Sequence, residues 1–201
     1  MSIGIIDYEV GNLRSIQKAF EYVGATAIIS GDVQELMGCE NLVLPGVGAF
    51  AYCREQLDAN FDDITILISS RPTLGICVGM QLMFDYSLEN GRTEGLRLIK
   101  GYVDKIHTES LPVPHTGWSP LLLKSGNANP LFRDVPDKTF FYFNHSFSCN
   151  ASQLTSVIGT ADYGSNFVCA VTEGNCYGIQ FHPEKSGSAG LKLLKNFHDF
   201  C

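Results

Sequence analysis

The feature that most constrains the fold of this chain is a regular alternation of short apolar runs and amphipathic segments in its first third. Residues 3–7 form a short apolar run that ends on a polar residue. Gly11-Asn12 then opens a segment with apolar side chains at helical spacing, and Gly24 can end it. This alternation predicts an α/β fold in which helices cover both faces of a parallel sheet.

The same patterns predict the other elements. Strands are expected over residues 25–29, 41–44 and 73–76, and then over residues 101–106, 139–143, 155–160, 167–172 and 176–181. Helices are expected over residues 51–70, from near Gly79, and after Ser186 or Ser188. No repeat, low-complexity tract or linker divides the 201 residues, which suits a single domain over residues 1–201.

Composition and charge restrict the class of protein. A hydrophobic fraction of 45% supports a sizeable core, and a net charge of -7 disfavours nucleic acid and anionic lipid as partners. No apolar run approaches the roughly 18 residues of a membrane span, and the N-terminus lacks a signal peptide's basic region. The seven cysteines form no CxxC pair, and the histidines lack metal-site spacing. We expect a cytoplasmic protein with no metal and no cofactor.

One cysteine follows an expected strand, within residues 75–79, whose sequence is GICVG. The pattern G-x-C-x-G is typical of a nucleophile elbow, in which small residues permit a tight turn that lifts the nucleophile above the sheet. The N-terminus of the following helix favours a thiolate at Cys77, and the backbone N–H of Val78 is oriented to serve an oxyanion. The same glycines also fit a buried structural cysteine.

A base is expected near Cys77, because a free thiol with a pKa of about 8.5 is mostly protonated at neutral pH. His182 directly follows an apolar strand, and Pro183 stiffens its loop. Glu184 can hold the second ring nitrogen and stabilise the imidazolium. Taken alone, His182 also fits an ordinary loop histidine. Of the remaining histidines, His107 and His198 are expected in solvent, whereas His115 and His145 are expected to line the site or its rim.

Two motifs combine into a specific pattern: residues 75–81, GICVGMQ, and residues 180–186, QFHPEKS. Together they resemble the class I, or triad, glutamine amidotransferases. Three further segments narrow the match: residues 7–13, DYEVGNL; residues 44–50, LPGVGAF; and residues 114–118, PHTGW. These look like the glutaminase subunits of imidazole glycerol phosphate synthase, and the resemblance covers essentially the whole chain.

The resemblance implies the three-layer, flavodoxin-like fold of this class, with a mostly parallel central sheet and additional strands in the second half. It implies Cys77 as nucleophile, His182 as general acid/base and Glu184 as the residue that orients the imidazole. The family further implies an oxyanion hole formed by the N–H groups of Val47 and Val78. It implies glutamine contacts from Gly48, Gln81, Ser146 and Phe147, and a partner interface at Asn12 and Lys185.

By the same resemblance, the chain hydrolyses L-glutamine and passes ammonia to a (β/α)8-barrel cyclase subunit in a heterodimer. That subunit would make imidazole glycerol phosphate and AICAR in histidine biosynthesis. A partner is also expected on chemical grounds, because ammonia is mostly protonated at neutral pH and is useful only when passed directly to an acceptor. The chain has no room for a barrel of roughly 250 residues.

Departures from the family pattern occur at Glu9, Ser119, Asn144 and Phe147. They leave open a paralogous glutaminase that supplies ammonia for surface-sugar biosynthesis. A cysteine hydrolase of another amide and a non-catalytic module with a vestigial triad also stay open. Gln81 and the loop at residues 45–48 favour glutamine, and the complete triad argues against loss of activity.

Overall fold

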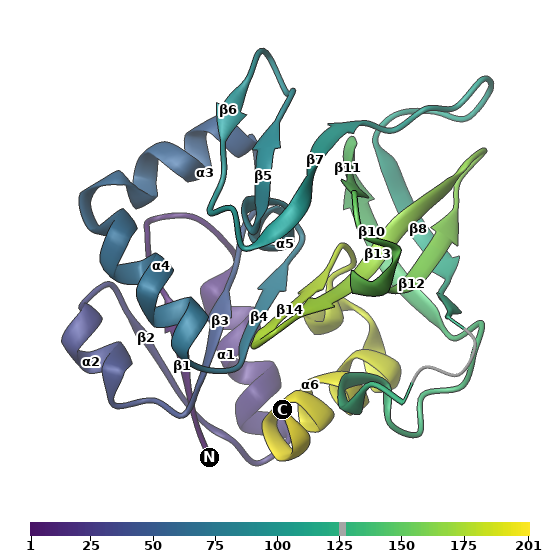
Figure 1. The fold of residues 1–201 in the computed structure, drawn as a ribbon. Coiled ribbons are helices and arrows are strands. Elements are labelled where there is room, and N and C mark those ends of the chain that lie inside the picture. Colours follow the sequence, from purple (N-terminus) through teal and green to yellow (C-terminus); the bar gives the residue numbers. More distant parts are fainter. Residues whose placement is uncertain (125–127) are drawn as a thin grey trace.

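Figure 1 shows the computed structural model of the chain, which describes residues 1–124 and 128–201. The helices are α1 (Leu13–Tyr22), α2 (Val33–Met37), α3 (Phe50–Leu57), α4 (Phe61–Ser70), α5 (Val78–Leu82) and α6 (Gly187–Phe200). The first strands are β1 (Ser2–Ile6), β2 (Thr26–Ser30), β3 (Asn41–Leu44), β4 (Thr73–Ile76), β5 (Phe84–Ser87), β6 (Thr93–Glu94) and β7 (Ile99–Lys105). The later strands are β8 (His115–Pro120), β9 (Leu122–Leu123), β10 (Phe140–His145), β11 (Phe147–Ala151), β12 (Val157–Asp162), β13 (Asn166–Glu173) and β14 (Cys176–Ile179).

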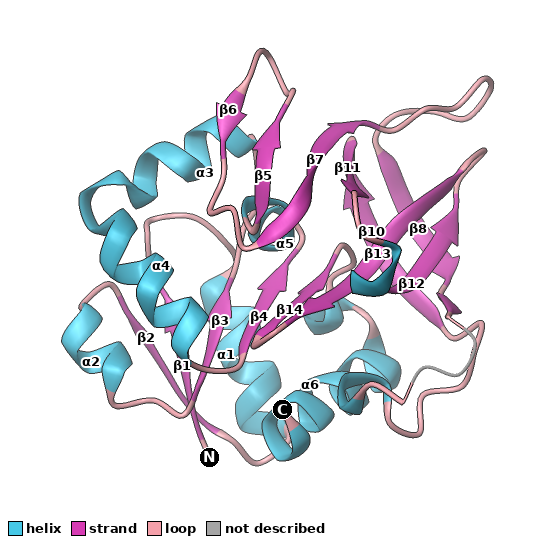
Figure 2. Ribbon diagram, viewed as in Figure 1, coloured by secondary structure: helices cyan, strands magenta, loops and turns pink. Residues whose placement is uncertain are grey.

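The parallel half of the main sheet combines strands from the first third of the chain with its last strand. Its order is β2-β1-β3-β4-β14, and every neighbouring pair is parallel. Two groups of helices flank these strands, with α1 against α6 and α2 against α4 (Figure 2). Strands β3 and β4 are buried along their whole length, as parallel strands covered on both faces must be. The predicted α/β fold with a mostly parallel central sheet is confirmed.

The second half of the chain adds antiparallel strands, as expected. From β14 the sheet continues through β13, β11 and β7 in antiparallel pairs and ends with β5 and β6. Strands β8 and β10 form a separate antiparallel pair in which His115 lies opposite His145. The N–H of His182 donates to the carbonyl of Tyr142 on β10 at 2.9 Å, so this pair adjoins the turn that carries His182.

The structure differs from the sequence-based expectation in several elements. The helical region expected over residues 51–70 is two helices, separated by a 3-10 turn at Asp58–Asn60. Aspartate and asparagine favour such breaks because their side chains compete for backbone hydrogen bonds. Six short elements carry no clear periodicity and were not expected: α2, β5, β6, β8, β9 and β11.

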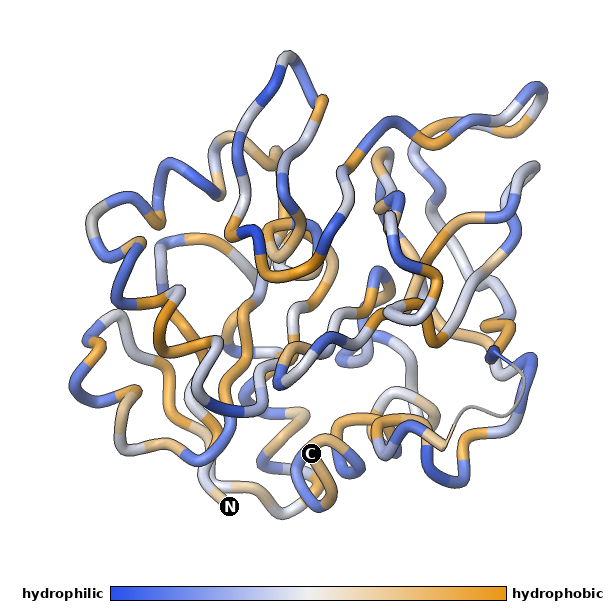
Figure 3. The backbone as a smooth tube through the Cα atoms, viewed as in Figure 1, coloured by the Kyte–Doolittle hydropathy of each residue, from blue (hydrophilic) through white to orange (hydrophobic). Residues whose placement is uncertain are grey.

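The apolar core lies along the central strands and the inner faces of the helices. Figure 3 shows hydrophobic residues concentrated on the central strands and hydrophilic residues at the outer loops. Phe20 of α1 packs edge-on against Phe197 of α6, with ring centroids 6.3 Å apart, and both side chains are fully buried. Among the residues that the structure describes, no helix is long and apolar enough to cross a membrane.

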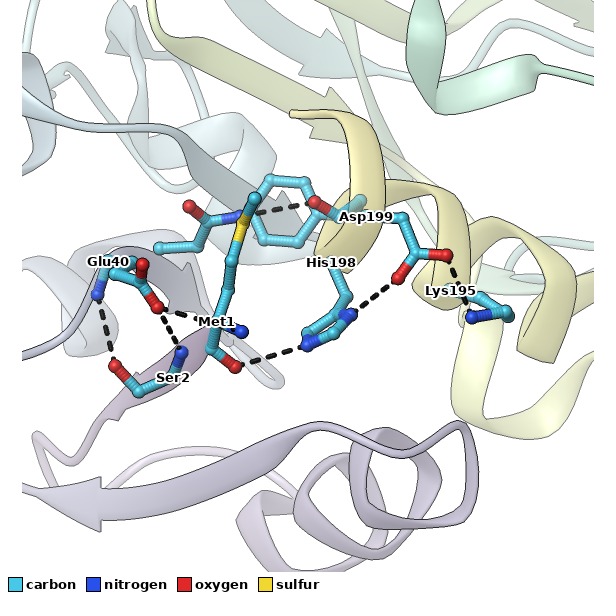
Figure 4. A network of polar contacts seen from close by, with 8 residues as sticks. Met1, Ser2, Glu40, Lys195, His198 and Asp199 are labelled. Carbon is cyan, nitrogen blue, oxygen red and sulfur yellow. Dashed lines mark hydrogen bonds and ion pairs between the residues drawn. The ribbon is translucent and has the colours of Figure 1, made fainter.

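The two ends of the chain are joined by polar contacts (Figure 4). His198 contacts Asp199 through Nδ1 at 2.6 Å and the carbonyl of Met1 through Nε2 at 3.1 Å. The backbone N–H of Ser2 donates to Glu40. The His198 side chain is only 15% exposed, and its expected position in solvent was wrong, because the ring is held between Asp199 and Met1, the residue before β1. His107 is exposed, as expected.

Candidate active site

The turn between β4 and α5 places Cys77 at the carboxyl end of an interior strand of the sheet. Cys77 has φ 55° and ψ −111°, a backbone conformation that residues with a side chain rarely adopt. Its N–H donates to the carbonyl of Ile179 at 2.8 Å, which extends the pairing of β4 with β14. A Cβ on Gly75 would lie 2.8 Å from the carbonyl oxygen of Gly79, so the flanking glycines let the helix start directly over the strand. The predicted elbow geometry is present.

Three loops meet at the carboxyl ends of β3, β4 and β14, which are neighbours in the sheet. Together with residues 144–147, Glu89 and Pro114, they line a cavity of about 290 Å³, close to the lower end of typical small-molecule sites at roughly 300 Å³. Nine of the predicted site residues line this cavity: Val47, Gly48, Cys77, Val78, Gln81, Ser146, Phe147, His182 and Lys185. The structure therefore brings together side chains that are far apart in the sequence.

His182 lies between Cys77 and Glu184. Its Nδ1 is 3.0 Å from Oε1 of Glu184, and the ring also forms a side-chain hydrogen bond with Cys77. Burial lowers the pKa of His182, but the contacts with Cys77 and Glu184 outweigh burial and raise the pKa to about 9. This arrangement favours an imidazolium beside the sulfur, which is the charge distribution that an activated thiolate requires.

Glu184 is held almost entirely out of solvent, with a side chain only 2% exposed. Its second oxygen, Oε2, is buried and has no hydrogen-bond partner among the described residues. His182 is thus the main compensation for this buried carboxylate, which further favours the charged imidazole. The turn is fixed by Ser186, whose hydroxyl donates to the carbonyl of His182 at 2.6 Å and accepts from the N–H of Tyr142 at 3.0 Å. Ser186 therefore braces the site and does not cap α6 with its side chain.

The loop after β3 carries Val47, the other predicted oxyanion donor. The buried Tyr8 hydroxyl donates to the carbonyl of Pro45, and the Cys53 thiol donates to the carbonyl of Val47 at 3.4 Å. Burial raises the pKa of Cys53 to about 11, so its thiol proton is retained. Within the described residues, neither the Gly46 carbonyl nor the Val47 N–H has a hydrogen-bond partner. The peptide between them is free to present its N–H to a ligand.

Gln81 projects from α5 into the cavity and is almost fully buried. Its Nε2 donates to the carbonyl of Phe147 at 3.0 Å and to Oε1 of Gln180 at 3.0 Å. Since both amide hydrogens are used, Oε1 is left as the acceptor for a ligand. The carbonyl of Phe147 is engaged by this bond, so the other atoms of Phe147 are the ones left to contact a ligand.

The predicted interface residues lie outside the catalytic cluster. Asn12 is exposed at the start of α1, and Lys185 is exposed at the mouth of the cavity. Helix α1 contacts the turn at Pro183–Lys185, so both residues belong to one region of the surface. The Lys185 Nζ lies 6.0 Å from the ring of Tyr142, and Trp118, 53% exposed, packs on the same ring.

His145 lines the cavity and His115 is buried behind it, which refines the expectation that both line the site or its rim. The sequence alone assigned no roles to Gln180, Tyr8 or Cys53. Gln180 and Tyr8 each lie inside a recognised segment, residues 180–186 and 7–13, and that was the only available signal. Tyr8 and Cys53 act through loop carbonyls, and no residue pattern indicates that action.

The backbone at Glu9 shows why the family often has glycine at this position, although it does not explain the glutamate. Its φ is 64°, in the left-handed region where glycine is least costly. Ser119 and Asn144 replace no group of the Cys77–His182–Glu184 cluster. Ser119 contacts Nε2 of His115 at 2.9 Å, and Asn144 accepts from the Thr116 hydroxyl at 3.0 Å.

The strand-end cysteine, its histidine and carboxylate partners, and the surrounding α/β sheet define the chain as a glutamine amidotransferase of class I. The family profile described as "Glutamine amidotransferase class-I" matches residues 4–200, and the chain belongs to this family.

Within the class, the chain is similar to curated HisH subunits. It is 44% identical to "Imidazole glycerol phosphate synthase subunit HisH" of Methanosarcina barkeri, over 99% of this chain and 98% of that protein. It is also 44% identical to the protein of the same name from Geobacter metallireducens, over 98% of this chain and 97% of that protein. The solved structure of PurLQS from Thermotoga maritima shares the fold, with a TM-score of 0.73. That structure is 18% identical, over 99% of this chain and 98% of the other.

Proposed function

We propose that the chain is the glutaminase subunit of an imidazole glycerol phosphate synthase. It hydrolyses glutamine to glutamate and passes ammonia to a cyclase subunit that makes imidazole glycerol phosphate and AICAR in histidine biosynthesis. The observation that carries the proposal is the buried cluster of Cys77, His182 and Glu184, which opens into a cavity of about 290 Å³. The two HisH proteins, 44% identical over almost their whole length, support the pathway.

The chemistry follows from the charges of the cluster. The Cys77 thiolate attacks the side-chain amide carbon of glutamine, and the carbonyl electrons move onto oxygen. The N–H groups of Val47 and Val78 stabilise this oxyanion. His182 donates its proton to the amide nitrogen, the C–N bond breaks, and ammonia leaves a glutamyl thioester. Water then attacks the thioester as His182 accepts its proton, and glutamate is released with the thiolate restored.

Glutamine recognition rests on other residues that line the same cavity. Gln81 offers its free Oε1 to the N–H groups of the substrate amide. Gly48, Ser146 and Phe147 contact the remaining atoms of glutamine. These residues line the same cavity as Cys77, which supports their assignment.

The partner is a (β/α)8-barrel protein that docks over the mouth of the cavity, on the face with Asn12 and Lys185. An exposed tryptophan packed edge-on against a tyrosine supports an interface there, because both residue types are enriched in protein–protein contacts. Direct docking would give ammonia a path that excludes water. We further propose that residues 1–201 form one glutamine amidotransferase domain.

The decisive experiment is glutamate release by the purified chain together with its barrel partner. Cys77→Ser should abolish turnover and leave the fold intact, because serine fits the turn but is a far weaker nucleophile. Cys39→Ser, at a buried cysteine outside the cavity, is the matched control and should retain activity. Full glutamate production by Cys77→Ser would overturn the assignment of the nucleophile.

The pathway is tested separately by asking which protein co-purifies with the chain from its own cell. The histidine-pathway cyclase is expected. Capture of a sugar-pathway enzyme in its place would support the paralogous glutaminase. An amide-substrate panel separates both from a cysteine hydrolase of another amide.

A further inference from the structure

A continuous series of buried and partly buried hydrogen bonds ends on the sulfur of Cys77. The Gln180 side chain is fully buried, and its Nε2 lies 3.5 Å from Sγ of Cys77. The orientation of the Gln180 amide is determined by its other contact. Its Oε1 accepts from Gln81, whose Nε2 can only donate, so the NH2 group of Gln180 must face the sulfur.

The donor and the acceptor in each contact behind Gln81 are determined by the same reasoning. The carbonyl of Phe147 accepts from Gln81 at 3.0 Å and lies 2.8 Å from Nδ1 of His145. A carbonyl cannot donate, so Nδ1 of His145 must carry a proton. In the neutral ring Nε2 is then an acceptor, and the group that meets this atom is Nδ1 of His115, 3.1 Å away.

The proton positions of the two residues on strand β8 follow by the same reasoning. Nδ1 of His115 must carry the proton that it donates to His145, so Nε2 of the neutral His115 ring accepts. The Ser119 hydroxyl lies 2.9 Å from this Nε2 and is its donor. Burial supports two neutral rings, since it lowers the pKa of His145 to about 3 and that of His115 to about 4.

An N–H group aimed at a sulfur stabilises the thiolate relative to the thiol, and it does so most strongly away from water. His182 also contacts this sulfur. Unlike His182, the Gln180 amide keeps its hydrogens at every stage of the reaction. It can therefore hold the sulfur when the imidazole has given its proton away.

The geometry points to Gln180 as a second group that holds the Cys77 thiolate, kept in place by Gln81, the Phe147 carbonyl and the positioning residues His145, His115 and Ser119. This inference rests on the proposed role of Cys77 as the nucleophile. It adds a fixed hydrogen-bond donor to the imidazole, and it connects the sulfur to Ser119, the neighbour of the exposed Trp118 on β8.

The test is the rate of Cys77 alkylation by iodoacetamide as a function of pH, followed by mass spectrometry of the labelled peptide. It needs neither glutamine nor a partner, so it stays informative even if the proposed function fails in the glutaminase assay. Gln180→Met keeps the size of the side chain but removes the donor. The alkylation midpoint should move to higher pH by about one unit or more, because hydrogen bonds to charged groups are strong. With glutamine as substrate, kcat should fall more than KM rises.

A second set of variants tests the far end of the series and is less invasive. Ser119→Ala should move the alkylation midpoint in the same direction by a smaller amount, and Ser119→Asn should restore it, because an amide N–H can also donate to His115. Ser156→Ala is the matched control. Ser156 is equally buried but donates to Glu173, and its loss should leave the midpoint unchanged.

The other titratable groups around Cys77 are the same in all these proteins: Tyr8, Cys53, Glu89, His145, Cys149, His182, Glu184 and Lys185. A shift in the alkylation midpoint therefore reports the loss or displacement of the Gln180 N–H donor. An unchanged midpoint in folded Gln180→Met would overturn the inference. If Gln180→Met does not fold, an equal midpoint for Ser119→Ala and Ser156→Ala would overturn it.

Discussion

At the scale of single residues, the environment of each histidine decides its charge. His182 gains a carboxylate and a sulfur as partners, and these raise its pKa to about 9 in spite of burial. His145 and His115 are also buried but contact a carbonyl, a hydroxyl and each other, and burial lowers the pKa of both rings. One side chain type thus supplies a cation in one place and neutral donors in another.

The first prediction concerns the His182–Glu184 pair. His182→Ala should reduce glutamine turnover by about a hundredfold or more, because it removes the group that moves protons. Glu184→Gln should reduce turnover by a smaller factor, since a neutral amide can still contact the ring but stabilises the imidazolium less well. Steady-state and single-turnover rates measure both. A silent Glu184→Gln in the two assays would contradict the role of the carboxylate.

The second prediction concerns acid stability. The folded-state pKa values of His145 and His115 lie below the unfolded value of about 6.5, so the unfolded chain binds more protons in acid. The contribution of the two rings to the free energy of unfolding is complete above pH 6.5. It should decrease as pH falls towards 4, by up to about 1.4 kcal/mol per pH unit for each ring. Denaturant unfolding at pH 7, 6 and 5 measures this decrease.

His182 acts in the opposite direction and mostly outside this range. Its raised pKa contributes stability that is complete below pH 6.5 and is lost progressively as pH rises from 6.5 through about 9, so it can only reduce the difference between pH 7 and pH 6 and leaves the decrease from pH 6 to pH 5 to the other groups. His145→Gln should remove about half of the acid-dependent decrease. His107→Gln, at an exposed ring, should leave it unchanged. The interpretation fails if His145→Gln keeps the full pH dependence.

At the scale of elements, the site depends on how closely α5 approaches the ends of β3 and β4. A Cβ on Gly79 would overlap the backbone carbonyl of Leu44, and a Cβ on Gly46 would lie 2.5 Å from the N–H nitrogen of Gly79. Backbone meets backbone here, so no side-chain movement can relieve the overlap. The glycines keep the predicted oxyanion donors of two elements within one small cavity.

The third prediction follows from this close approach. Gly79→Ala should destabilise the fold by about 3 kcal/mol or more, or prevent soluble expression, because the sheet edge and the helix must separate. Gly38→Ala is the control, since Gly38 has φ −75° and its added Cβ would lie 3.3 Å from the nearest atom. That change should stay within about 1 kcal/mol. Thermal and denaturant unfolding compare the two, and equal stability would show that the elements can separate freely.

At the scale of the whole molecule, activity is expected to depend on a partner. The carbonyls of Pro45 and Val47 are held by Tyr8 and Cys53, whereas the peptide between Gly46 and Val47 has no such contact among the described residues. A partner that docks near this loop can therefore change the orientation of one peptide without disturbing the sheet. Losing one oxyanion donor costs about 2.7 to 4 kcal/mol, or roughly a hundred- to a thousandfold in rate.

The fourth prediction is that the isolated chain is a poor glutaminase, and that the barrel partner with its ligand raises glutamine hydrolysis by about a hundredfold or more. Lys185→Ala should weaken this activation more than it weakens basal hydrolysis, because Lys185 is exposed at the mouth of the cavity. Glutamate release by the chain alone and with its partner measures both. A rate already maximal for the isolated chain would refute control through the loop. Equal losses of activation and of basal hydrolysis in Lys185→Ala would assign the residue to the chemistry.

The sequence by itself determined the strands of the parallel half of the fold. Two predicted strands, at residues 41–44 and 73–76, match β3 and β4 to the residue. Buried parallel strands read as short apolar runs, and the elbow glycines and the histidine loop follow them directly, so local patterns were sufficient there.

The tertiary structure decided which segments of the chain lie next to one another. The pairing of β14 with β4 brings Gln180 to the sulfur of Cys77, and the pairing of β8 with β10 brings His115 to His145. Both depend on contacts between residues that are far apart in the chain, for which a hydrophobic period carries no information. Hydrogen bonds that join distant strands are set by sheet order and register, and these are decided only when the whole core packs.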